Sequence, residues 1–548
     1  MMTTRPIVAS LIALLATASA AKAKPPTLDR LFPPGAQRGQ TVAVKATGSF
    51  DHWPVHVWSD GPAIEVKAEK EKGQLSIIVA SDAKPGVHWI RLSDEEGATS
   101  LRPFLVGVLP ELVESESKDQ PNIALDHSRV TINGRLGKSN DVDEFSVPMK
   151  KGQLLVAAVD ANRLLGSPMD AVLQVASTDG FVLAQNDDDR GFDPRLTFEV
   201  PADGTYLVRI FAFPATPDST IGFAGGDAYI YRLTLTTGGF LDHGYPLAVA
   251  RSDPGQVEAH GWNVPETAKR LAVVADGNHE TASLIHPDFA NTVDIRLVAH
   301  AALIEQEPSD RDHPQAIPVP STVSGRIAPA RDQDVFTFPA KKGQTLSLLV
   351  ESESLGAPLD PVLRVTDAAG KTLNDVDDSG KEHDVQLAFT PPADGDYQLS
   401  IRDLHGHGGE RFVYRLTIAA PDPDYTLTLK ADRLTLTPDK AGTLEVAIER
   451  KNGFKSPIEV RFDGLPEGMT APSVRSEPGK DTEKTVTLSL TATAMAAATA
   501  PSGPFRVLGR AVDGAMVERP ARFAIEGLSA TTDQPWLTVL KPAAPKAP

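Results

Sequence analysis

Residues 305–397 begin with the sequence EQEPSD at Glu305 and end with ADGDY at Tyr397. Residues 114–206 begin with ESESKD at Glu114 and end with ADGTY at Tyr206. The spacing from Glu114 to Glu305 and from Tyr206 to Tyr397 is the same 191 residues. Between these ends, DVDEF at 141–145 matches DQDVF at 332–336, and KKGQ occurs at 150–153 and at 341–344. Carboxylates, glycines and aromatic residues keep one register, which indicates a duplicated domain.

The repeated order predicts short antiparallel strands. Polar and apolar residues alternate at 145–147 and 336–338, and each alternation leads through the KKGQ turn to an apolar run, 154–159 or 346–350. In the first repeat, the ADG turn is followed by a second alternation, in which Tyr206, Val208 and Ile210 are the apolar residues. Short alternating strands separated by Gly and Asp turns are typical of a β-sandwich.

Five motifs in order, Glu-x-Glu-x-x-Asp, Asp-x-Asp-x-Phe, Lys-Gly-Gln, an Asn-Asp acidic loop and Ala-Asp-Gly-x-Tyr, occur in both stretches. Both resemble the bacterial pre-peptidase C-terminal (PPC) domain, a jelly-roll-like β-sandwich found on secreted peptidases and other exported proteins. The collagen-binding modules of bacterial collagenases resemble this domain too, and in them a calcium cluster pins the segment before the first strand. The resemblance covers less than half of the chain.

The remaining segments predict further β-sandwiches, so the expected fold class is all-β, with tandem jelly-roll-like and Ig-like sandwiches. Alternating strands in residues 24–109, 238–301 and 421–528 resemble Ig-like or TIG-like domains. We expect a signal peptide at 1–23, PPC domains at 110–237 (the first repeat) and 302–420 (the second repeat), and a Pro/Ala-rich tail at 529–548. The three Ig-like segments are called the first, middle and last sandwich.

The beginning of the chain predicts export. Arg5 precedes an apolar run, and small residues of the Ala-x-Ala type follow it. This order is typical of a cleaved secretory signal, and the run is too short to span a bilayer. The chain has 548 residues, no cysteine and a formal charge of −18, which argues against nucleic acid and anionic membrane as partners. We expect a secreted, periplasmic or cell-surface protein.

The acidic motifs are the strongest candidate site. Calcium prefers six to eight oxygen ligands, and converging carboxylates repel one another unless a cation lies between them. Alternate residues of one strand face the same side, so the paired acids of each motif can converge. We therefore expect one calcium site in each repeat, formed by Glu305, Glu307, Asp310, Asp332 and Asp334 and by Glu114, Glu116, Asp119, Asp141 and Asp143. The alternative is a turn whose Asp side chains accept backbone N–H groups.

Other polar groups have simpler interpretations. The acidic loops 186–189 and 374–378 are expected to be solvated hairpin loops rather than metal ligands. His405 and His407 form a candidate metal pair, with a flexible Gly-rich turn as the alternative. Three tryptophans, Trp53, Trp58 and Trp89, could form a platform for a sugar, but packing in a small core is the favoured interpretation.

No catalytic motif is present in the sequence: it lacks a Gly-x-Ser-x-Gly elbow and a His-Glu-x-x-His helix, and it has no cysteine. The sequence therefore predicts a non-catalytic, calcium-stabilised binding or adhesion protein that engages an extracellular or envelope protein or polysaccharide. A structural spacer of the envelope and an accessory chain of a secreted peptidase are the alternatives.

Overall fold

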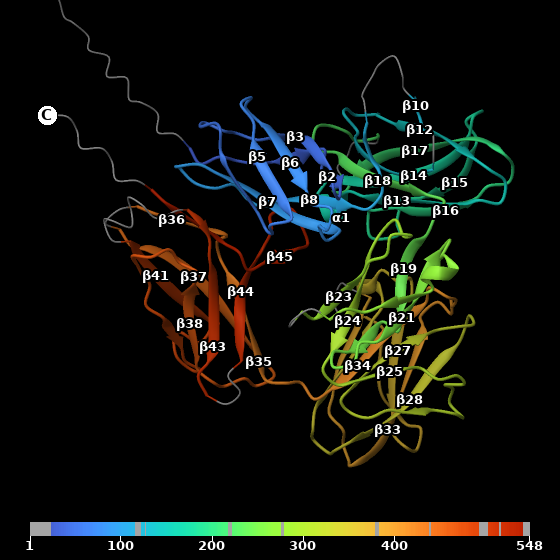
Figure 1. The fold of residues 1–548 in the computed structure, drawn as a ribbon. Helices are drawn as coiled ribbons and strands as arrows, with labels where there is room; N and C mark the ends of the chain where they lie inside the picture. Colours follow the sequence, from blue (N-terminus) through green and yellow to red (C-terminus); the bar gives the residue numbers. More distant parts are fainter. Residues whose placement is uncertain are drawn as a thin grey trace, which may run out of the picture.

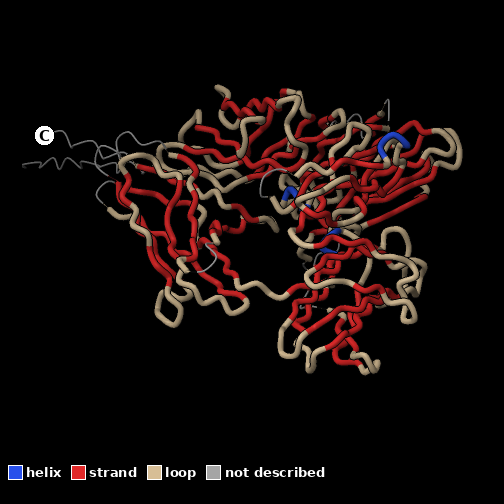
Figure 2. The backbone as a smooth tube through the Cα atoms, turned by 60° about the horizontal axis from the view of Figure 1, so that its bottom comes forward, coloured by secondary structure: helices blue, strands red, loops and turns tan. Residues whose placement is uncertain are grey.

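The computed structural model describes residues 24–114, 122–125, 128–217, 222–275, 279–378, 383–437, 440–492, 502–513 and 517–540. The expected signal peptide, together with Glu116 and Asp119, lies outside these residues. The described chain is almost entirely strand, with a few short helical turns (Figure 2). The predicted all-β class of tandem sandwiches is confirmed.

The first repeat consists of two five-stranded sheets. One sheet has the order β10 (Asn122–Ala124), β12 (Asp143–Met149), β17 (Gly204–Pro214), β14 (Met169–Ser177) and β15 (Val182–Asn186). The other has the order β16 (Arg195–Glu199), β13 (Leu154–Asp160), β18 (Ile230–Thr236), β11 (Arg129–Arg135) and β9 (Glu111–Val113). One short helix, α1 (Asn162–Leu165), follows β13.

The second repeat has the same strand order. One sheet contains β26 (Gln315–Ala316), β28 (Gln333–Ala340), β33 (Gly395–Asp403), β30 (Pro361–Thr366) and β31 (Thr372–Val376). The other contains β32 (Val385–Phe389), β29 (Leu346–Glu351), β34 (Val413–Ala419), β27 (Ser321–Arg326) and β25 (Ala301–Ile304). A 3₁₀ turn, η2 (Glu353–Leu355), takes the place of α1. In both repeats, the strand of each sheet that comes earliest in the chain (β9, β10, β25 or β26) pairs in parallel with its neighbour.

The repeated ADGxY motif has a structural role in both copies. The Tyr206 hydroxyl donates to the Ala202 carbonyl and the Tyr397 hydroxyl to the Ala393 carbonyl, both at 2.8 Å. The Asp of the same motif accepts the backbone N–H of the second Lys in the KKGQ turn: Asp203 accepts from Lys151, and Asp394 accepts from Lys342. The motif therefore joins two turns at one end of the sandwich and fixes the register of the strand that follows it.

The first sandwich has two four-stranded sheets. Their strands are β1 (Arg30–Phe32), β3 (Thr41–Thr47), β6 (Gln74–Val79) and β5 (Ile64–Ala68), and β2 (Gly35–Gln37), β8 (Arg102–Gly107), β7 (Gly86–Ser93) and β4 (His56–Ser59). The alternating segment 74–79 buries every second side chain, as its pattern predicts.

The middle sandwich is the smallest, with two three-stranded sheets. Its strands are β19 (Phe240–Tyr245), β21 (Gln256–Trp262) and β22 (Arg270–Ala272), and β20 (Ala248–Ala250), β24 (Val293–Val298) and β23 (Thr281–Leu284), with the turn η1 (Glu266–Ala268) between β21 and β22. Its Tyr245 hydroxyl donates to the Ser324 carbonyl of the second repeat at 2.8 Å, so this sandwich packs on its neighbour.

The last sandwich pairs a long sheet with a three-stranded one. The long sheet contains β39 (Met469–Thr470), β41 (Thr485–Ala492), β37 (Gly442–Lys451), β35 (Asp424–Leu429), β44 (Glu518–Ala524), β43 (Arg506–Ala511), β38 (Ile458–Asp463), β40 (Val474–Ser476) and, beside β44, β45 (Thr531–Thr532). The short sheet contains β36 (Arg433–Leu436), β46 (Trp536–Val539) and β42 (Gly503–Pro504).

Part of the expected tail belongs to this fold. Strand β46 pairs in parallel with β36, and Trp536, Leu537 and Val539 are buried. The prediction that the tail begins at residue 529 is therefore wrong for residues 529–540. A run of four residues beside a Pro/Ala-rich end is too short to stand out as a strand until its partner β36 is known.

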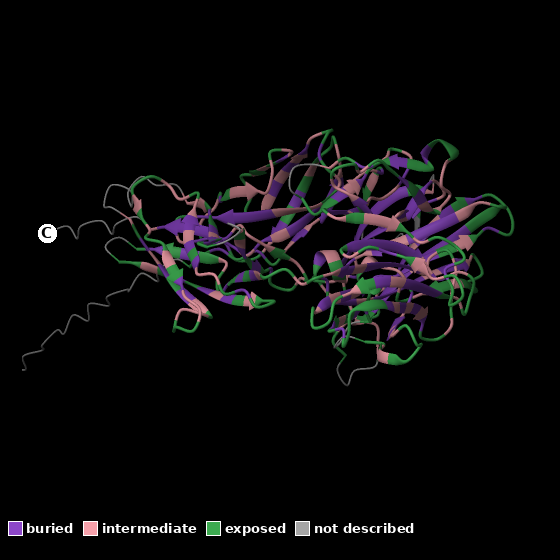
Figure 3. Cartoon of the chain, turned by 90° about the horizontal axis from the view of Figure 1, so that it is seen from below, coloured by how far each residue is buried: buried purple, intermediate pink, exposed green. Residues whose placement is uncertain are grey.

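The chain folds back on itself. The last sandwich lies beside the first sandwich, although the repeats and the middle sandwich separate them in sequence (Figure 1). Leu101 of the first sandwich belongs to the hydrophobic core of the last one, and Trp58 and Trp89 pack against that core. Buried residues follow the strands inside each sandwich, and exposed residues concentrate in the loops (Figure 3). In the described residues, no helix is long and apolar enough to cross a membrane.

Candidate functional site

Three carboxylates meet at one edge of the second repeat. Glu305 and Glu307 follow β25, and Asp334 lies in β28. One oxygen of each side chain lies within 4.8 Å of one oxygen of each of the others. Asp334 is buried, Glu305 is half-buried and Glu307 is exposed, so the cluster opens to solvent on one side.

Each of the three carboxylates accepts a hydrogen bond, with Glu307 accepting the Ser309 N–H at 3.0 Å, and one oxygen of Glu305 and one of Asp334 lack a donor from elsewhere in the described chain. Glu305 accepts the Arg326 N–H at 2.8 Å, and Asp334 accepts the Tyr414 hydroxyl at 2.5 Å. The other oxygens, Glu305 Oε1 and Asp334 Oδ1, are buried and receive no donor from other described residues, so the two carboxyl groups can hydrogen-bond only to each other, through a shared proton. A buried carboxylate oxygen without a donor is costly, so the pair calls for a proton or a cation.

The electrostatics of the pair agree with this requirement. Burial and the Glu305 carboxylate raise the pKa of Asp334, and burial, with a contribution from Glu307, raises the pKa of Glu305. Without a cation the pair therefore retains a proton at pH values where ordinary carboxyl groups are ionised. The set offers only oxygen ligands, which fits the preference of Ca²⁺.

A glycine makes room for the tyrosine behind the acids. A Cβ on Gly325 would lie 2.1 Å from the Tyr414 ring, and a Cβ on Gly134 would lie 2.2 Å from the Tyr231 ring. Each tyrosine is fully buried and donates its hydroxyl to the second Asp of the Asp-x-Asp motif, Asp334 or Asp143. The Gly and Tyr pair is therefore a shared element of both sites that the acidic motif alone does not reveal.

The remaining predicted acids of the second repeat serve turns. Asp332 accepts the Ala328 N–H at 3.1 Å, and Asp141 accepts the Gly137 N–H at 2.7 Å in the first repeat. Asp310 accepts the N–H groups of Asp312 and His313, both at 2.9 Å. The structure does not bring Asp310 or Asp332 into the three-carboxylate cluster.

The first repeat has a matching arrangement in part. Glu114 accepts the Arg135 N–H at 3.0 Å, and Asp143 accepts the Tyr231 hydroxyl at 2.6 Å. Glu116 and Asp119 lie outside the described residues, so the structure places only part of this predicted set.

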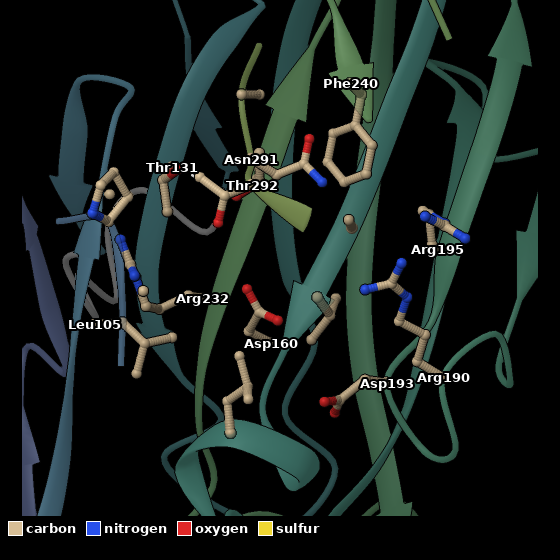
Figure 4. A pocket seen from close by; sticks show the side chains of 18 of the residues that line it. Leu105, Thr131, Asp160, Arg190, Asp193, Arg195, Arg232, Phe240, Asn291 and Thr292 are labelled. Carbon is tan, nitrogen blue, oxygen red and sulfur yellow. Dashed lines mark hydrogen bonds between the residues drawn. The ribbon is translucent and has the colours of Figure 1, made fainter. Parts of the chain in front are cut away.

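A second candidate site is a cavity of about 170 Å³ where the first sandwich, the first repeat and the middle sandwich meet (Figure 4). Asp160, Arg190, Asp193 and Arg232 lie around it, with Phe240 and Asn291 from the middle sandwich. Burial and the nearby Asp160 raise the pKa of Asp193 to about 6, although Asp193 accepts the first N–H groups of α1. Burial, Arg195 and Arg163 lower the pKa of Arg190 to about 10.

Comparison with known proteins identifies part of the second repeat. Residues 332–403 match the family model "Bacterial pre-peptidase C-terminal domain". The chain contains a PPC domain. A 74-residue segment is 42% identical to part of a probable subtilase-type serine protease of Deinococcus radiodurans, and it makes up 14% of this chain and 10% of that protein. The chain therefore spans about a tenth of the length of this relative.

Two solved structures are similar to this chain at low sequence identity. The pre-peptidase C-terminal domain of a Bacillus anthracis collagenase is 14% identical, with a TM-score of 0.16, and the match covers 19% of this chain and 92% of that domain. The four N-terminal Ig domains of Dscam1 isoform 4.4 are 11% identical, with a TM-score of 0.18, and the match covers 92% of this chain and 98% of that one.

An ion-pair network that joins the first repeat, the middle sandwich and the second repeat was not predicted. Arg195 Nη2 lies 2.8 Å from both Asp189 and Asp242, and Arg411 lies 3.2 Å from the same two acids. Trp262 covers both guanidinium groups. Burial acts to raise the pKa of Asp242, but His243 and the two arginines hold it well below its usual range. The expected solvation of the 186–189 loop is therefore wrong for Asp189, because partners from distant segments surround it.

The tryptophans and histidines also have defined places. Trp53 packs on the core of the first sandwich, whereas Trp58 and Trp89 pack against the last sandwich. Trp53 therefore packs in its own small core as predicted, whereas Trp58 and Trp89 pack against a different sandwich from the one that carries them. The imidazole rings of His405 and His407 lie 5.9 Å apart between their centroids, and each pairs with a different carboxylate: His407 lies 3.7 Å from Asp403, and His405 lies 3.7 Å from Asp360.

Proposed function

We propose that this chain is an exported, non-catalytic binding protein that engages an extended segment of another extracellular protein. The supporting observation is an apolar edge strand in the first repeat. Phe181, Val182 and Leu183 are 71%, 50% and 44% exposed, and they form the turn and the start of β15. Strand β15 is the last strand of its sheet.

The chemistry of this edge fits an extended peptide. The outer N–H and C=O groups of an edge strand are available to pair with a further strand, and exposed apolar side chains beside them provide pockets and contacts. Proteins usually protect such edges with charged residues. An unprotected apolar edge is therefore a feature that a partner strand would cover.

The second repeat provides a matched comparison. Pairing within each hairpin aligns Val182 with Thr372, because Val182 pairs with Ala176 and Thr372 pairs with Thr366. Lys371 and Thr372 thus replace Phe181 and Val182, and the exposed apolar run is absent there. We infer that the two repeats are copies of one domain type, both PPC domains, and that only the first carries the peptide-binding edge.

A polysaccharide ligand has less support. Sugar sites generally need exposed aromatic faces, and Trp53, Trp58 and Trp89 are used in packing. The match to a segment of a subtilase-type protease keeps an accessory role beside a secreted peptidase as a second candidate. Both roles need export, and neither needs catalysis by this chain.

We also propose that the second repeat binds Ca²⁺ through Glu305, Glu307 and Asp334, and that the first repeat binds it through the equivalent residues Glu114, Glu116 and Asp143. The cation would neutralise the buried oxygens of Glu305 and Asp334 and hold the segment after β25 against β28. Asp141, Asp310 and Asp332 would keep their roles in turns.

The test of the binding edge is affinity capture by the full chain from an extracellular fraction. We expect a protein partner whose capture falls at least about tenfold in Leu183→Lys, because the new charge would have to be buried at the interface. The control variant Thr372→Lys, at an exposed position of the equivalent strand in the second repeat, should retain capture. Equal capture by both variants would contradict the assignment of the edge.

A further inference from the structure

A second cluster of metal-ligating side chains lies at the loop end of the second repeat, apart from the calcium site. Asp360 precedes β30, Asp378 follows β31, His383 precedes β32 and His405 follows β33. Three separate connections thus bring two imidazoles and two carboxylates together. The sequence suggested only His405 and His407, which are close in the chain.

The distances place Asp360 at the centre of the cluster. His383 Nδ1 lies 3.3 Å from Asp378 Oδ1 and 3.8 Å from Asp360 Oδ1, and His405 Nε2 lies 3.7 Å from Asp360 Oδ2. One ligand atom each of Asp360, Asp378 and His383 lies within 4.8 Å of the others. Ligands at Zn–N and Zn–O distances of about 2.0–2.2 Å in a tetrahedron are about 3.3–3.6 Å apart, close to the observed spacing.

The central carboxylate lacks a hydrogen bond on one oxygen. Asp360 is 18% exposed, and its Oδ1 is buried without a hydrogen-bond partner among the described residues. Its neighbours, His383 and His405, are 56% and 63% exposed, so solvent can deliver a metal to the site. A buried carboxylate oxygen directed at an accessible imidazole is an arrangement that a cation between them would complete.

Neighbouring side chains hold the ligands in place. Asp403 is buried and accepts the N–H groups of His405 and His407 at 2.9 and 2.8 Å, which fixes the loop that carries His405. Asp403 also accepts the Asp360 N–H at 3.2 Å. Glu353 accepts the His383 N–H at 3.0 Å. These bonds hold the backbone of the loops that carry the ligands.

We propose that Asp360, Asp378, His383 and His405 bind a zinc ion. Imidazole and carboxylate ligands in a tetrahedral set suit Zn²⁺, whereas Ca²⁺ takes oxygen ligands in larger numbers. The ion would join the two sheets of the sandwich, because β30, β31 and β33 belong to one sheet and β32 to the other.

The first repeat serves as a natural control. Asp170, Asp187 and Asp188 lie near one another there, and burial and the two neighbouring charges raise the pKa of Asp170. The only histidine between residues 110 and 237 is His127, far in sequence from these acids. The first repeat thus keeps carboxylates at this end without the imidazoles that select zinc.

The test is zinc binding by the full chain after removal of any affinity tag, in buffer with excess Ca²⁺ to fill oxygen-only sites. We expect isothermal titration with zinc chloride to give one site per chain. Co²⁺ in place of zinc should give the visible absorption of a tetrahedral complex. His383→Ala and His405→Ala should each weaken zinc binding at least tenfold, since each removes a ligand.

Two variants serve as controls, and both should bind zinc as the unaltered chain does. His407→Ala removes a neighbouring histidine that pairs with Asp403, and Glu305→Gln changes the separate calcium site. Surface ion pairs without a metal site are the alternative. Absence of a stoichiometric zinc site, an octahedral Co²⁺ spectrum, or unchanged zinc affinity in both His383→Ala and His405→Ala would overturn the proposal.

Discussion

At the scale of single residues, the calcium proposal depends on Glu305 and Asp334, whose buried oxygens face each other without a donor from the rest of the described structure. Calcium that binds only the folded chain stabilises it by about 2.7 kcal/mol at a hundredfold excess over Kd. We expect Asp334→Asn and Glu305→Gln to lose this stabilisation. Asp332→Asn should retain it, because an Asn oxygen can still accept the Ala328 N–H. Hydrogen exchange of residues 305–310 with and without calcium is the measurement, and equal protection by calcium in Asp334→Asn would contradict the assignment.

The same pair predicts a pH dependence. Burial raises the pKa values of Glu305 and Asp334 above the ordinary values of 4.5 and 3.8, so the folded state keeps a proton that the unfolded state releases. In chelator, the free energy of unfolding of this repeat should therefore fall as the pH rises above the ordinary range. One retained proton gives a slope of about 1.4 kcal/mol per pH unit. Excess calcium should remove the slope and release a proton on binding. The measurement is a set of denaturation curves between pH 5 and pH 8 in chelator. A free energy of unfolding that stays constant or rises over this range would contradict the prediction.

Sequence patterns found part of the candidate site. The Glu-x-Glu and Asp-x-Asp motifs predicted that Glu305, Glu307 and Asp334 come together, because alternation places paired acids on one face. The pattern could not separate them from Asp310 and Asp332, since the same residue type also accepts backbone N–H groups in turns. The partners Tyr414 and Gly325 lie on other strands, and only the sheet register brings them to the acids.

At the scale of elements, spacing and alternation predicted the strands of both repeats and their closing turns well. Strand β46 was missed because its burial depends on β36, a hundred residues earlier. Its Trp536, Leu537 and Val539 are buried, and each such side chain contributes about 1.5–3 kcal/mol.

A chain that ends at Leu540 should melt like the full chain, and a chain that ends at Gln534 should lose the transition of the last sandwich. Equal calorimetric profiles for the two truncated chains would contradict the role of β46.

At the scale of the whole molecule, contacts between the first and last sandwiches close the chain on itself. Arg91 of β7 is fully buried, lies 3.3 Å from Asp432 and stacks over Trp536. The sequence could not reveal this contact, because 341 residues separate the two charges. Removing Asp432 would leave the buried Arg91 guanidinium without its carboxylate partner, which is destabilising.

This contact predicts a defect in the overall shape. Asp432→Ala should release the last sandwich from the first and increase the radius of gyration in small-angle X-ray scattering. The matched variant Asp422→Ala, at an exposed position in the linker before β35, should leave the scattering curve unchanged. An unchanged radius of gyration in Asp432→Ala would show that the other contacts of the interface suffice.

The central claim is that the first repeat engages an extended protein segment along β15. The most direct measurement places a photo-crosslinking amino acid at Val182 and, as the matched position, at Thr372, and exposes each full chain to the extracellular fraction under light. We predict a covalent adduct to a partner protein from position 182, with mass spectrometry placing the crosslink in an extended segment, and no such adduct from position 372. No adduct from position 182, or the same adducts from both positions, would contradict the claim.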